Sequence, residues 1–176
     1  MATTRGILVG RFQPFHSGHL QLVETIVDEV DELVLGIGSA DASHEPHNPF
    51  TAGERIMMIQ KTLERLDTTT YPVPLEDLDR NSVWVSHVQS MSPRFDVAYS
   101  NNPLVIRLFN EAAVEVRQTK LFDRENLRGQ EVRRRMRNGD NWQQSVPDPV
   151  IEVIEEIDGI QRIEAITRDD NGPGMG

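Results

Sequence analysis

The chain has 176 residues, of which 38% are hydrophobic and 26% are charged, and this composition predicts one folded domain. Its 28 acidic and 18 basic residues leave a formal net charge of −10, which opposes binding to nucleic acid. Because there is no cysteine, disulfides, zinc–thiolate sites, iron–sulfur clusters and cysteine nucleophiles are excluded. The apolar runs are too short to cross a bilayer and no signal-peptide pattern is visible, so we expect a cytoplasmic protein that does not associate with membranes.

Almost all of the positive charge comes from arginine, because Lys61 and Lys120 are the only lysines. An acidic surface that is poor in lysine suits a protein in concentrated salt, where screening shortens its self-repulsion. We therefore expect a salt-adapted protein, and full stability in dilute buffer would contradict this expectation.

The first part of the chain alternates between short apolar runs and helical spacing. Residues 6–10 predict a strand, and apolar residues spaced over 20–30 predict a helix. The uniform run over 33–37 predicts a second strand, buried on both faces of a parallel sheet. A helix over 51–66 follows a polar loop and starts with a capping box, in which a threonine and a glutamate three residues later satisfy backbone amides.

The second part continues the alternation. Residues 70–74 predict a third strand, and its prolines favour a sheet edge. Asn81 is expected to cap a helix that ends at Met91, and residues 96–99 predict a fourth strand. Asn102 offers an N-cap, with proline at the first position of a helix that ends near residue 111. The remaining predicted elements are a strand over 114–118, helices over 129–138 and 147–157, and a shorter apolar segment over 160–166.

Strands that alternate with helices at this spacing predict βαβ units. We therefore predict an α/β fold, with a Rossmann-like parallel sheet of about five strands and helices on both faces. One domain is expected over residues 1–168, followed by a disordered tail over 169–176. Such sheets bind ligands at the carboxyl ends of their strands, near the point where the strand order reverses. The loop after the first strand is the first candidate site.

That loop runs from Gly10 to His19 and reads GRFQPFHSGH. It matches neither the GxGxxG dinucleotide pattern nor the P-loop pattern. His16 and His19 lie on one face at a predicted helix start, where free amides and the helix dipole attract anions. Gly18 lets a ligand approach the backbone, and Arg11 adds a permanent charge with a two-pronged set of donors. The pattern favours phosphate binding.

Paired histidines are also compatible with a metal site. The spacing of His16 and His19 recurs in His44 and His47. No carboxylate or cysteine completes either set, so we expect none of these residues to ligate a metal.

The segment from Gly10 to His19 resembles the signature of the HxGH nucleotidyltransferase superfamily. Within this superfamily the chain is similar to the archaeal nicotinamide-nucleotide adenylyltransferases from about Arg5 to Ile166. The likeness includes the segments 38–40, 48–55, 100–105 and 129–136. It implies the HxGH nucleotidyltransferase fold, a homo-oligomer with a hexamer favoured, and the reaction of ATP with nicotinamide mononucleotide, helped by Mg²⁺, to give NAD and pyrophosphate.

The same resemblance implies roles for individual residues. His16 and His19 would bind the ATP phosphates, and Arg11 and Arg133 would neutralise charge on the transferring group and on the leaving pyrophosphate. Magnesium would bridge phosphate oxygens. Further ATP contacts are expected from Gly10, Phe12, Gln13, Gly18, Asn101, Asn102 and Gln130.

The resemblance also places the nicotinamide nucleotide. Trp84 would stack on the nicotinamide ring and attract its cationic face, and Asn81 would read the carboxamide. Phe122 would help to enclose the ring. Apart from the resemblance, a tryptophan on a helix is more typical of core packing, and Asn81 is explained equally well as a helix cap.

Two positions depart from the family pattern. Gln130 stands near the place of a usual serine or threonine, so a hydroxyl contact to the ATP phosphates is lost or is replaced by the amide. His47 lies in a loop where an arginine is expected to help hold the triphosphate. We assign residues 134–137 to surface or oligomer contacts, and Glu54 and Arg55 to the helix cap and a salt bridge.

Two alternatives stay open. One is a sister HxGH transferase that uses another phosphorylated acceptor, either flavin mononucleotide or phosphopantetheine. Trp84 and Asn81 favour nicotinamide over these acceptors. The other is a non-catalytic nucleotide sensor that has kept the pocket and lost turnover, and the intact histidines and arginines of the motifs argue against it.

Overall fold

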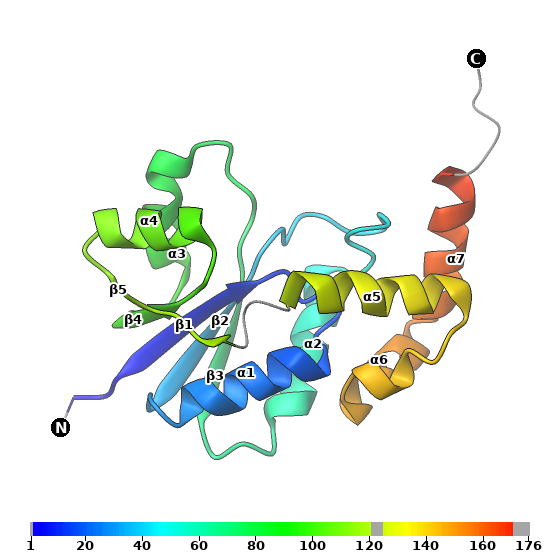
Figure 1. Cartoon of the computed structure of the whole chain (residues 1–176), viewed down its shortest axis with the longest axis horizontal. Coiled ribbons are helices and arrows are strands. Elements are labelled where there is room, and N and C mark those ends of the chain that lie inside the picture. Colours follow the sequence, from blue (N-terminus) through cyan, green and yellow to red (C-terminus); the bar gives the residue numbers. More distant parts are fainter. Residues whose placement is uncertain (1, 121–124, 171–176) are drawn as a thin grey trace.

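The computed structural model describes residues 2–120 and 125–170. The described residues form one parallel five-stranded sheet in the order β3-β2-β1-β4-β5. Helices cover both faces of this sheet (Figure 1). The predicted α/β class, the Rossmann-like sheet and the number of strands are confirmed.

The strand order reverses next to the central strand. β1 (Arg5–Gly10) pairs with β2 (Glu32–Ile37) on one side and with β4 (Val97–Tyr99) on the other. From β2 the chain continues outward to β3 (Thr69–Pro74), and from β4 it continues outward to β5 (Glu115–Arg117). The prolines of β3 are accommodated because an edge strand pairs on one side only, as the sequence predicted.

The register brings the loops after β1 and β4 to the same end of the sheet. Leu8 pairs with Tyr99, and Gly10 pairs with Ile37. The segments that follow β1 and β4 therefore leave the sheet side by side, at the topological switch point.

The larger helical layer covers the face of the sheet that carries Leu8, Leu33 and Leu35, all of which are buried. The three C-terminal helices share the same hydrophobic cluster with α1 and α2. No helix within the described ranges is long and apolar enough to span a membrane. The helices of this layer are α1 (Ser17–Val27), α2 (Ala52–Leu63), α5 (Glu125–Asn138), α6 (Asp148–Glu156) and α7 (Gly159–Asp170).

The smaller layer covers the opposite face, where Ile7 and Val34 are buried. It consists of α3 (Trp84–Met91), which a short 3-10 turn η1 (Asn81–Val83) precedes, and α4 (Pro103–Glu111).

Two predicted helix starts are present as expected. The Thr51 hydroxyl accepts from the backbone N–H of Glu54 at 3.1 Å, and the Glu54 carboxylate accepts from that of Thr51 at 2.8 Å. The Asn102 side chain accepts from the amides of Leu104 and Val105. These capping contacts join residues at most three positions apart, so they can be predicted locally.

Other boundaries differ from the prediction. Asn81 does not cap a helix: it lies inside the 3-10 turn η1, and neither η1 nor α3 has a side-chain cap. Helix α5 starts four residues before the predicted Gly129, and a 3-10 turn η3 (Gln143–Ser145) was not predicted. Helix α7 continues the apolar segment to Asp170, two residues into the predicted tail, and the rest of that tail lies outside the described residues.

Candidate active site

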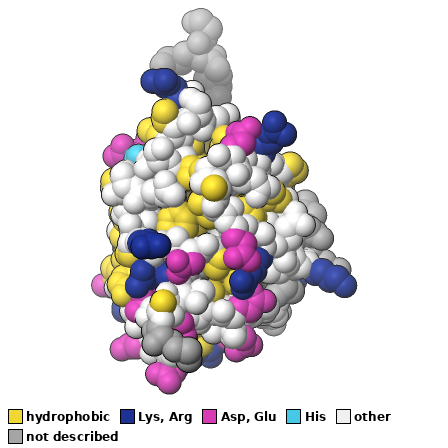
Figure 2. Space-filling model, turned by 90° about the vertical axis from the view of Figure 1, so that its left-hand side faces the viewer, with side chains coloured by type: hydrophobic (Ala, Val, Ile, Leu, Met, Phe, Trp, Pro, Cys, Tyr) yellow, Lys and Arg dark blue, Asp and Glu magenta, His cyan; other side chains and the backbone are white. Residues whose placement is uncertain are grey.

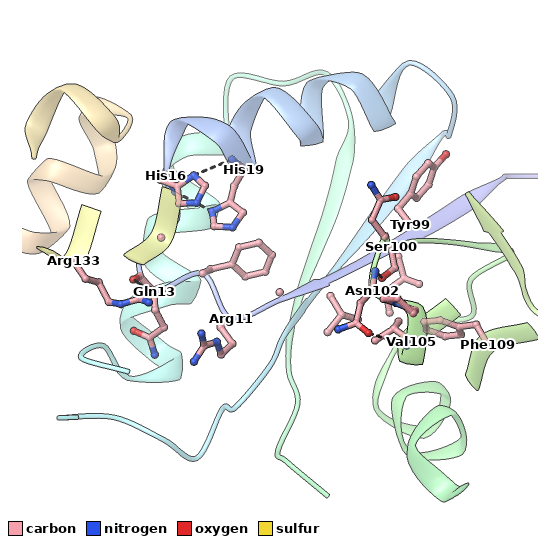
Figure 3. A pocket seen from close by; sticks show the side chains of 17 residues that line it. Arg11, Gln13, His16, His19, Tyr99, Ser100, Asn102, Val105, Phe109 and Arg133 are labelled. Atoms are coloured by element: carbon pink, nitrogen blue, oxygen red, sulfur yellow. Dashed lines mark hydrogen bonds between the residues drawn. The ribbon is translucent and has the colours of Figure 1, made fainter. Parts of the chain in front are cut away.

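A cavity of about 460 Å³ opens at the carboxyl end of the sheet, next to the switch point between β1 and β4 (Figure 3). One wall comes from β1 and the loop into α1, the other from β4 and α4, and α5 adds two residues. It lies where the sheet type predicts a ligand site. Its lining consists of Ile7, Val9, Gly10, Arg11, Phe12, Gln13, His16, His19, Tyr99, Ser100, Asn101, Asn102, Pro103, Val105, Phe109, Gly129 and Arg133.

The two motif histidines form a capping box at the start of α1. Nδ1 of His16 accepts from the backbone N–H groups of Gly18 at 3.1 Å and His19 at 3.3 Å. The backbone N–H of His16 in turn donates to Nδ1 of His19 at 3.1 Å, and the two rings stack with centroids 3.6 Å apart. A backbone N–H only donates, so both Nδ1 atoms must carry a lone pair. In the neutral rings the proton is therefore on Nε2, which becomes a donor for a ligand oxygen.

The environment of His19 keeps its ring neutral. Burial, with a smaller contribution from the charge of Arg128, lowers the pKa of His19 from 6.5 to about 3. At neutral pH His19 is therefore a hydrogen-bond donor without a charge.

This low pKa predicts how pH acts on stability. Because the folded-state pKa lies below the unfolded value, the unfolded chain binds more protons between about pH 6.5 and 3. The contribution of His19 to stability is complete above that window and is lost as the pH falls through it. His19→Asn, which keeps an acceptor near the Nδ1 position, should show a shallower fall in unfolding free energy than the wild type when both are measured by denaturant titration. Equal slopes would contradict the low pKa.

Two arginines give the cavity its charge. Arg133 is only 5% exposed, and its Nη1 donates to the carbonyl oxygen of Gln13 at 3.0 Å. Its buried Nε has no hydrogen-bond partner within the described part of the chain. Burial, together with repulsion from the exposed Arg11, lowers the pKa of Arg133 to about 10, so it stays charged at neutral pH. The described residues that line the cavity include no Asp or Glu, and an anionic ligand would balance this charge.

Gln13 shapes the loop with its side chain. Its amide donates to the carbonyl of Phe50 and accepts from the backbone N–H of Phe50, both at 2.9 Å. Phe12 has a φ of 53°, and its ring meets that of His19 edge-on, with centroids 4.8 Å apart. A Cβ on Gly10 would lie 3.0 Å from the Phe12 ring, so a larger residue there would require the ring to move by a few tenths of an ångström. The loop is thus held by contacts that leave Arg11 and the histidines facing the cavity (Figure 3).

The two predicted asparagines line the opposite wall. Asn102 caps α4 with its side-chain oxygen, and its backbone N–H donates to the Ser100 hydroxyl at 3.1 Å. Asn101 donates from Nδ2 to the carbonyl of Thr119 at 2.6 Å. Both residues therefore have structural contacts, and their predicted contact with ATP stays a prediction.

Several predicted site residues do not line this cavity. Trp84 is half-buried and packs edge-on against Phe109, and Phe109 does line the cavity. Asn81 is exposed. Gly18 faces a second hollow beside the start of α1, and Gln130 is exposed. His47 is also exposed and outside the lining, and Phe122 lies outside the described residues. The roles assigned to these residues stay predictions.

Arg55 holds the loops of the site together, which the sequence interpretation missed. Its side chain is fully buried and donates to the carbonyls of Arg11 and Gly38, both at 2.8 Å, and of Ser39 at 3.1 Å. The salt bridge of the capping-box Glu54 is made with Arg162 instead. Position 55 shares the buried face of α2 with Met58, Ile59, Thr62 and Leu63, and this helical spacing was the available signal.

Comparison with known proteins identifies the family. A family model described as cytidylyltransferase-like matches residues 7–135. The chain therefore belongs to the cytidylyltransferase-like family. It is 63% identical to a nicotinamide-nucleotide adenylyltransferase of Halobacterium salinarum, over 98% of both chains, and 64% identical to that of Halorubrum lacusprofundi, over 94% of both. The likeness to the protein of Methanosarcina barkeri is 52% over 98% of this chain and 99% of the relative.

Within that class, the chain belongs to the nicotinamide-nucleotide adenylyltransferase family, which confirms the predicted resemblance and the predicted enzyme class. Two of these relatives come from halophilic archaea, which supports the predicted salt adaptation.

A solved structure shares the fold. The bifunctional NMN adenylyltransferase/ADP ribose pyrophosphatase of Francisella tularensis, complexed with AMP and a Mn ion, superposes with a TM-score of 0.76 at 22% identity. The alignment covers 95% of this chain and 53% of the other, so this chain spans about half the length of that bifunctional protein.

Proposed function

We propose that this chain joins ATP and nicotinamide mononucleotide to give NAD and pyrophosphate. The observation that carries the proposal is the cavity at the switch point, in which two histidines and two arginines gather with no acid among the described lining residues. This cavity lies in a chain with a formal net charge of −10, so the local excess of positive charge is specific to the site.

The reaction needs no nucleophile from the protein, because the phosphate of nicotinamide mononucleotide already is one. One of its oxygens attacks the α-phosphorus of ATP in line, and the bond from that phosphorus to the bridging oxygen breaks. The electron pair of the broken bond leaves with pyrophosphate. Such chemistry depends mainly on alignment and on neutralisation of charge.

The described side chains suit these two tasks. The Nε2–H groups of His16 and His19 would donate to phosphate oxygens without adding a charge of their own. Arg133 and Arg11 would neutralise the charge that develops on the transferring group and on pyrophosphate. The capping box and the Gln13–Phe50 contact hold these groups in place before the substrate binds.

ATP would enter as its magnesium complex. The described residues contain no cluster of three or more His, Asp or Glu side chains that would hold a metal ion. The phosphate oxygens of ATP would hold the cation, and when bound it would help to neutralise the charge of the phosphates. The Mn ion with AMP in the Francisella protein supports a divalent cation in this family.

The acceptor would bind on the side of the cavity formed by α4. Trp84 packs edge-on against Phe109 of the cavity wall, so the indole lies next to this side of the cavity and is the proposed stacking partner of the nicotinamide ring. Asn81, one turn earlier, and Phe122 are the other candidates for this subsite. We keep all three as proposed contacts.

The proposal includes a homo-oligomer, with a hexamer favoured, and a cytoplasmic location. Among the residues that the structure describes, three large hydrophobic side chains are exposed, on the α3–α4 side: Val83, Met91 and Leu104. Figure 2 looks onto this side and shows hydrophobic atoms among mixed acidic and basic groups. Light scattering during gel filtration in molar potassium chloride would measure the size of the assembly.

The test is release of pyrophosphate from MgATP with a panel of acceptors, in dilute buffer and in molar potassium chloride. Nicotinamide mononucleotide should support the fastest turnover, and flavin mononucleotide and phosphopantetheine should support little. The two salt conditions prevent a salt-requiring fold from being mistaken for an inactive enzyme. ATP binding without turnover in either salt would overturn the proposal in favour of a sensor.

A further inference from the structure

The C-terminal helix α7 holds the loop before α2 through one arginine. Nη1 of Arg162 donates to Oε1 of Glu54 at 2.6 Å, and its Nη2 donates to Oε2 at 2.8 Å. Nη1 also donates to the carbonyl oxygen of Pro49 at 3.1 Å. The side chains of Arg162 and Glu54 are only 17% and 14% exposed, so little water competes for these contacts. The two-pronged pair fixes the guanidinium beside the Pro49 carbonyl.

The carboxylate of Glu54 is itself held at the start of α2. Its Oε1 also accepts from the backbone N–H of Thr51 at 2.8 Å. Burial alone would raise the pKa of Glu54, but the hydrogen bonds from Arg162 and Thr51 outweigh it and lower the pKa. Glu54 is therefore ionised at neutral pH, and it ties Arg162 to the first turn of α2.

The carbonyl of Pro49 belongs to a peptide group that is held from both sides. It accepts a second, longer hydrogen bond from the backbone N–H of His44 at 3.4 Å. The other end of the group is the N–H of Phe50, which donates to Oε1 of Gln13 at 2.9 Å. A trans peptide group is planar, and its carbonyl and N–H point in opposite directions. Arg162 on one side and Gln13 on the other thus fix the same plane.

A second contact places α7 against the same segment. A Cβ on Gly159, the first residue of α7, would lie 3.2 Å from the ring of Phe50, which is fully buried. Arg162, three residues later, donates to the carbonyl that precedes Phe50. The start of α7 therefore supports the 49–50 peptide with both its backbone and a side chain.

Gln13 connects this peptide group to the cavity. Its backbone carbonyl accepts from Nη1 of Arg133 at 3.0 Å, and both residues line the cavity (Figure 3). Arg162 and Pro49 do not line it. A rotation of the 49–50 peptide would remove one of the two hydrogen bonds that anchor the Gln13 side chain. The position of the Arg133 guanidinium therefore depends on a residue outside the cavity.

We propose that Arg162 is a positioning residue for adenylyl transfer. It fixes the 49–50 peptide, which holds Gln13 and, through the carbonyl of Gln13, the guanidinium of Arg133 in the orientation that receives ATP. An ion pair with Glu54 alone would only stabilise the fold, and the contact with Pro49 is what links Arg162 to the cavity. This inference rests on the proposed function, because it takes Arg133 as a ligand of the ATP phosphates.

The test is a double-mutant cycle between Arg162 and Gln13. Binding of MgATP is measured by calorimetry in molar potassium chloride without an acceptor, for the wild type, Arg162→Met, Gln13→Met and the double variant. Arg162→Met should weaken ATP binding about 10-fold, as is typical of changes in a coupled network. Because both residues hold one peptide group, the double variant should bind ATP about as weakly as the weaker single variant. Arg168→Met is the matched control on α7, since Arg168 is 80% exposed and pairs with Glu164, and it should bind ATP as the wild type does.

Glu54→Gln separates positioning from stability. The glutamine oxygen can still accept from Thr51 and Arg162, so Arg162 should keep its contact with Pro49 while the charge of the pair is lost. Urea unfolding should show a lower stability, and the affinity for ATP should stay near that of the wild type. A loss of ATP binding as large as in Arg162→Met would assign the effect to the ion pair and overturn the inference.

Two results of the cycle would also overturn it. In one, Arg162→Met binds ATP as the wild type does. In the other, the losses of the two single variants multiply in the double variant, as expected of independent supports of the fold. If Arg162→Met does not fold, Arg162→Lys takes its place in the cycle, because it keeps the charge beside Glu54 and loses the two-pronged set of donors. Failure of the proposed function is separate, because turnover would then be absent with every acceptor while the cycle in ATP binding would keep its result.

Discussion

Replacing His16 with asparagine should lower kcat about 100- to 1000-fold, the typical cost of one preorganised donor to a developing charge. Asparagine is among the best N-cap residues, and its side-chain oxygen can replace Nδ1 as the acceptor for the amides of Gly18 and His19. It does not reach the position of Nε2, so the donor into the cavity is lost. Stability should therefore change little while the rate falls.

Three variants separate the role of His16 as a helix cap from its role in the reaction. His16→Ala should lose both the rate and about 1 kcal/mol of stability, because alanine cannot accept the capping hydrogen bonds. His44→Asn is the matched control, since His44 is exposed, lies outside the cavity and has a φ of 57° that asparagine tolerates. A wild-type kcat in His16→Asn would show that the ring donates nothing to the reaction.

Replacing Arg55 with methionine should lower the unfolding free energy by about 3 kcal/mol or more. Methionine fills a similar volume but leaves the partly buried carbonyls of Arg11, Gly38 and Ser39 without their donor. These carbonyls belong to the loops after β1 and β2, so ATP binding should also weaken. Urea unfolding in molar potassium chloride would measure the loss of stability.

Arg65→Met is the control for this change. Arg65 lies just after the end of α2. Its side chain is 63% exposed and pairs with Glu24. Removal of such a surface pair should change stability by no more than about 0.5 kcal/mol. Equal stability of the two variants would mean that the carbonyls around Arg55 find other donors.

The sequence predicted most of the fold, because its main signals are local. The capping pairs at Thr51 and Asn102 act over three residues, and the uniform apolar run of β2 marks a strand with neighbours on both sides. The edge position of β3 followed from its prolines. The start of the 3-10 turn at Asn81 was not predictable in this way, because the same residue type begins several kinds of turn.

The candidate site was predictable where one motif supplies several groups. Arg11, His16 and His19 lie within nine residues of the chain and reach one cavity together. The role of Arg55 depends on carbonyls 16 to 44 residues away, which no local pattern reveals. The placement of Gln130 and Arg128 depends on how α5 is rotated against α1, and only the packed structure gives that rotation.

The contrast between the cavity and the rest of the molecule has a consequence for how fast substrate arrives. At long range an approaching ATP experiences the net negative charge, which slows its encounter with the protein. The cationic lining attracts ATP only within a few ångströms, where salt screens least. Dissolved salt removes the distant repulsion and largely preserves the near attraction. The association rate of ATP should therefore rise with ionic strength, opposite to the trend of enzymes that steer their substrates electrostatically.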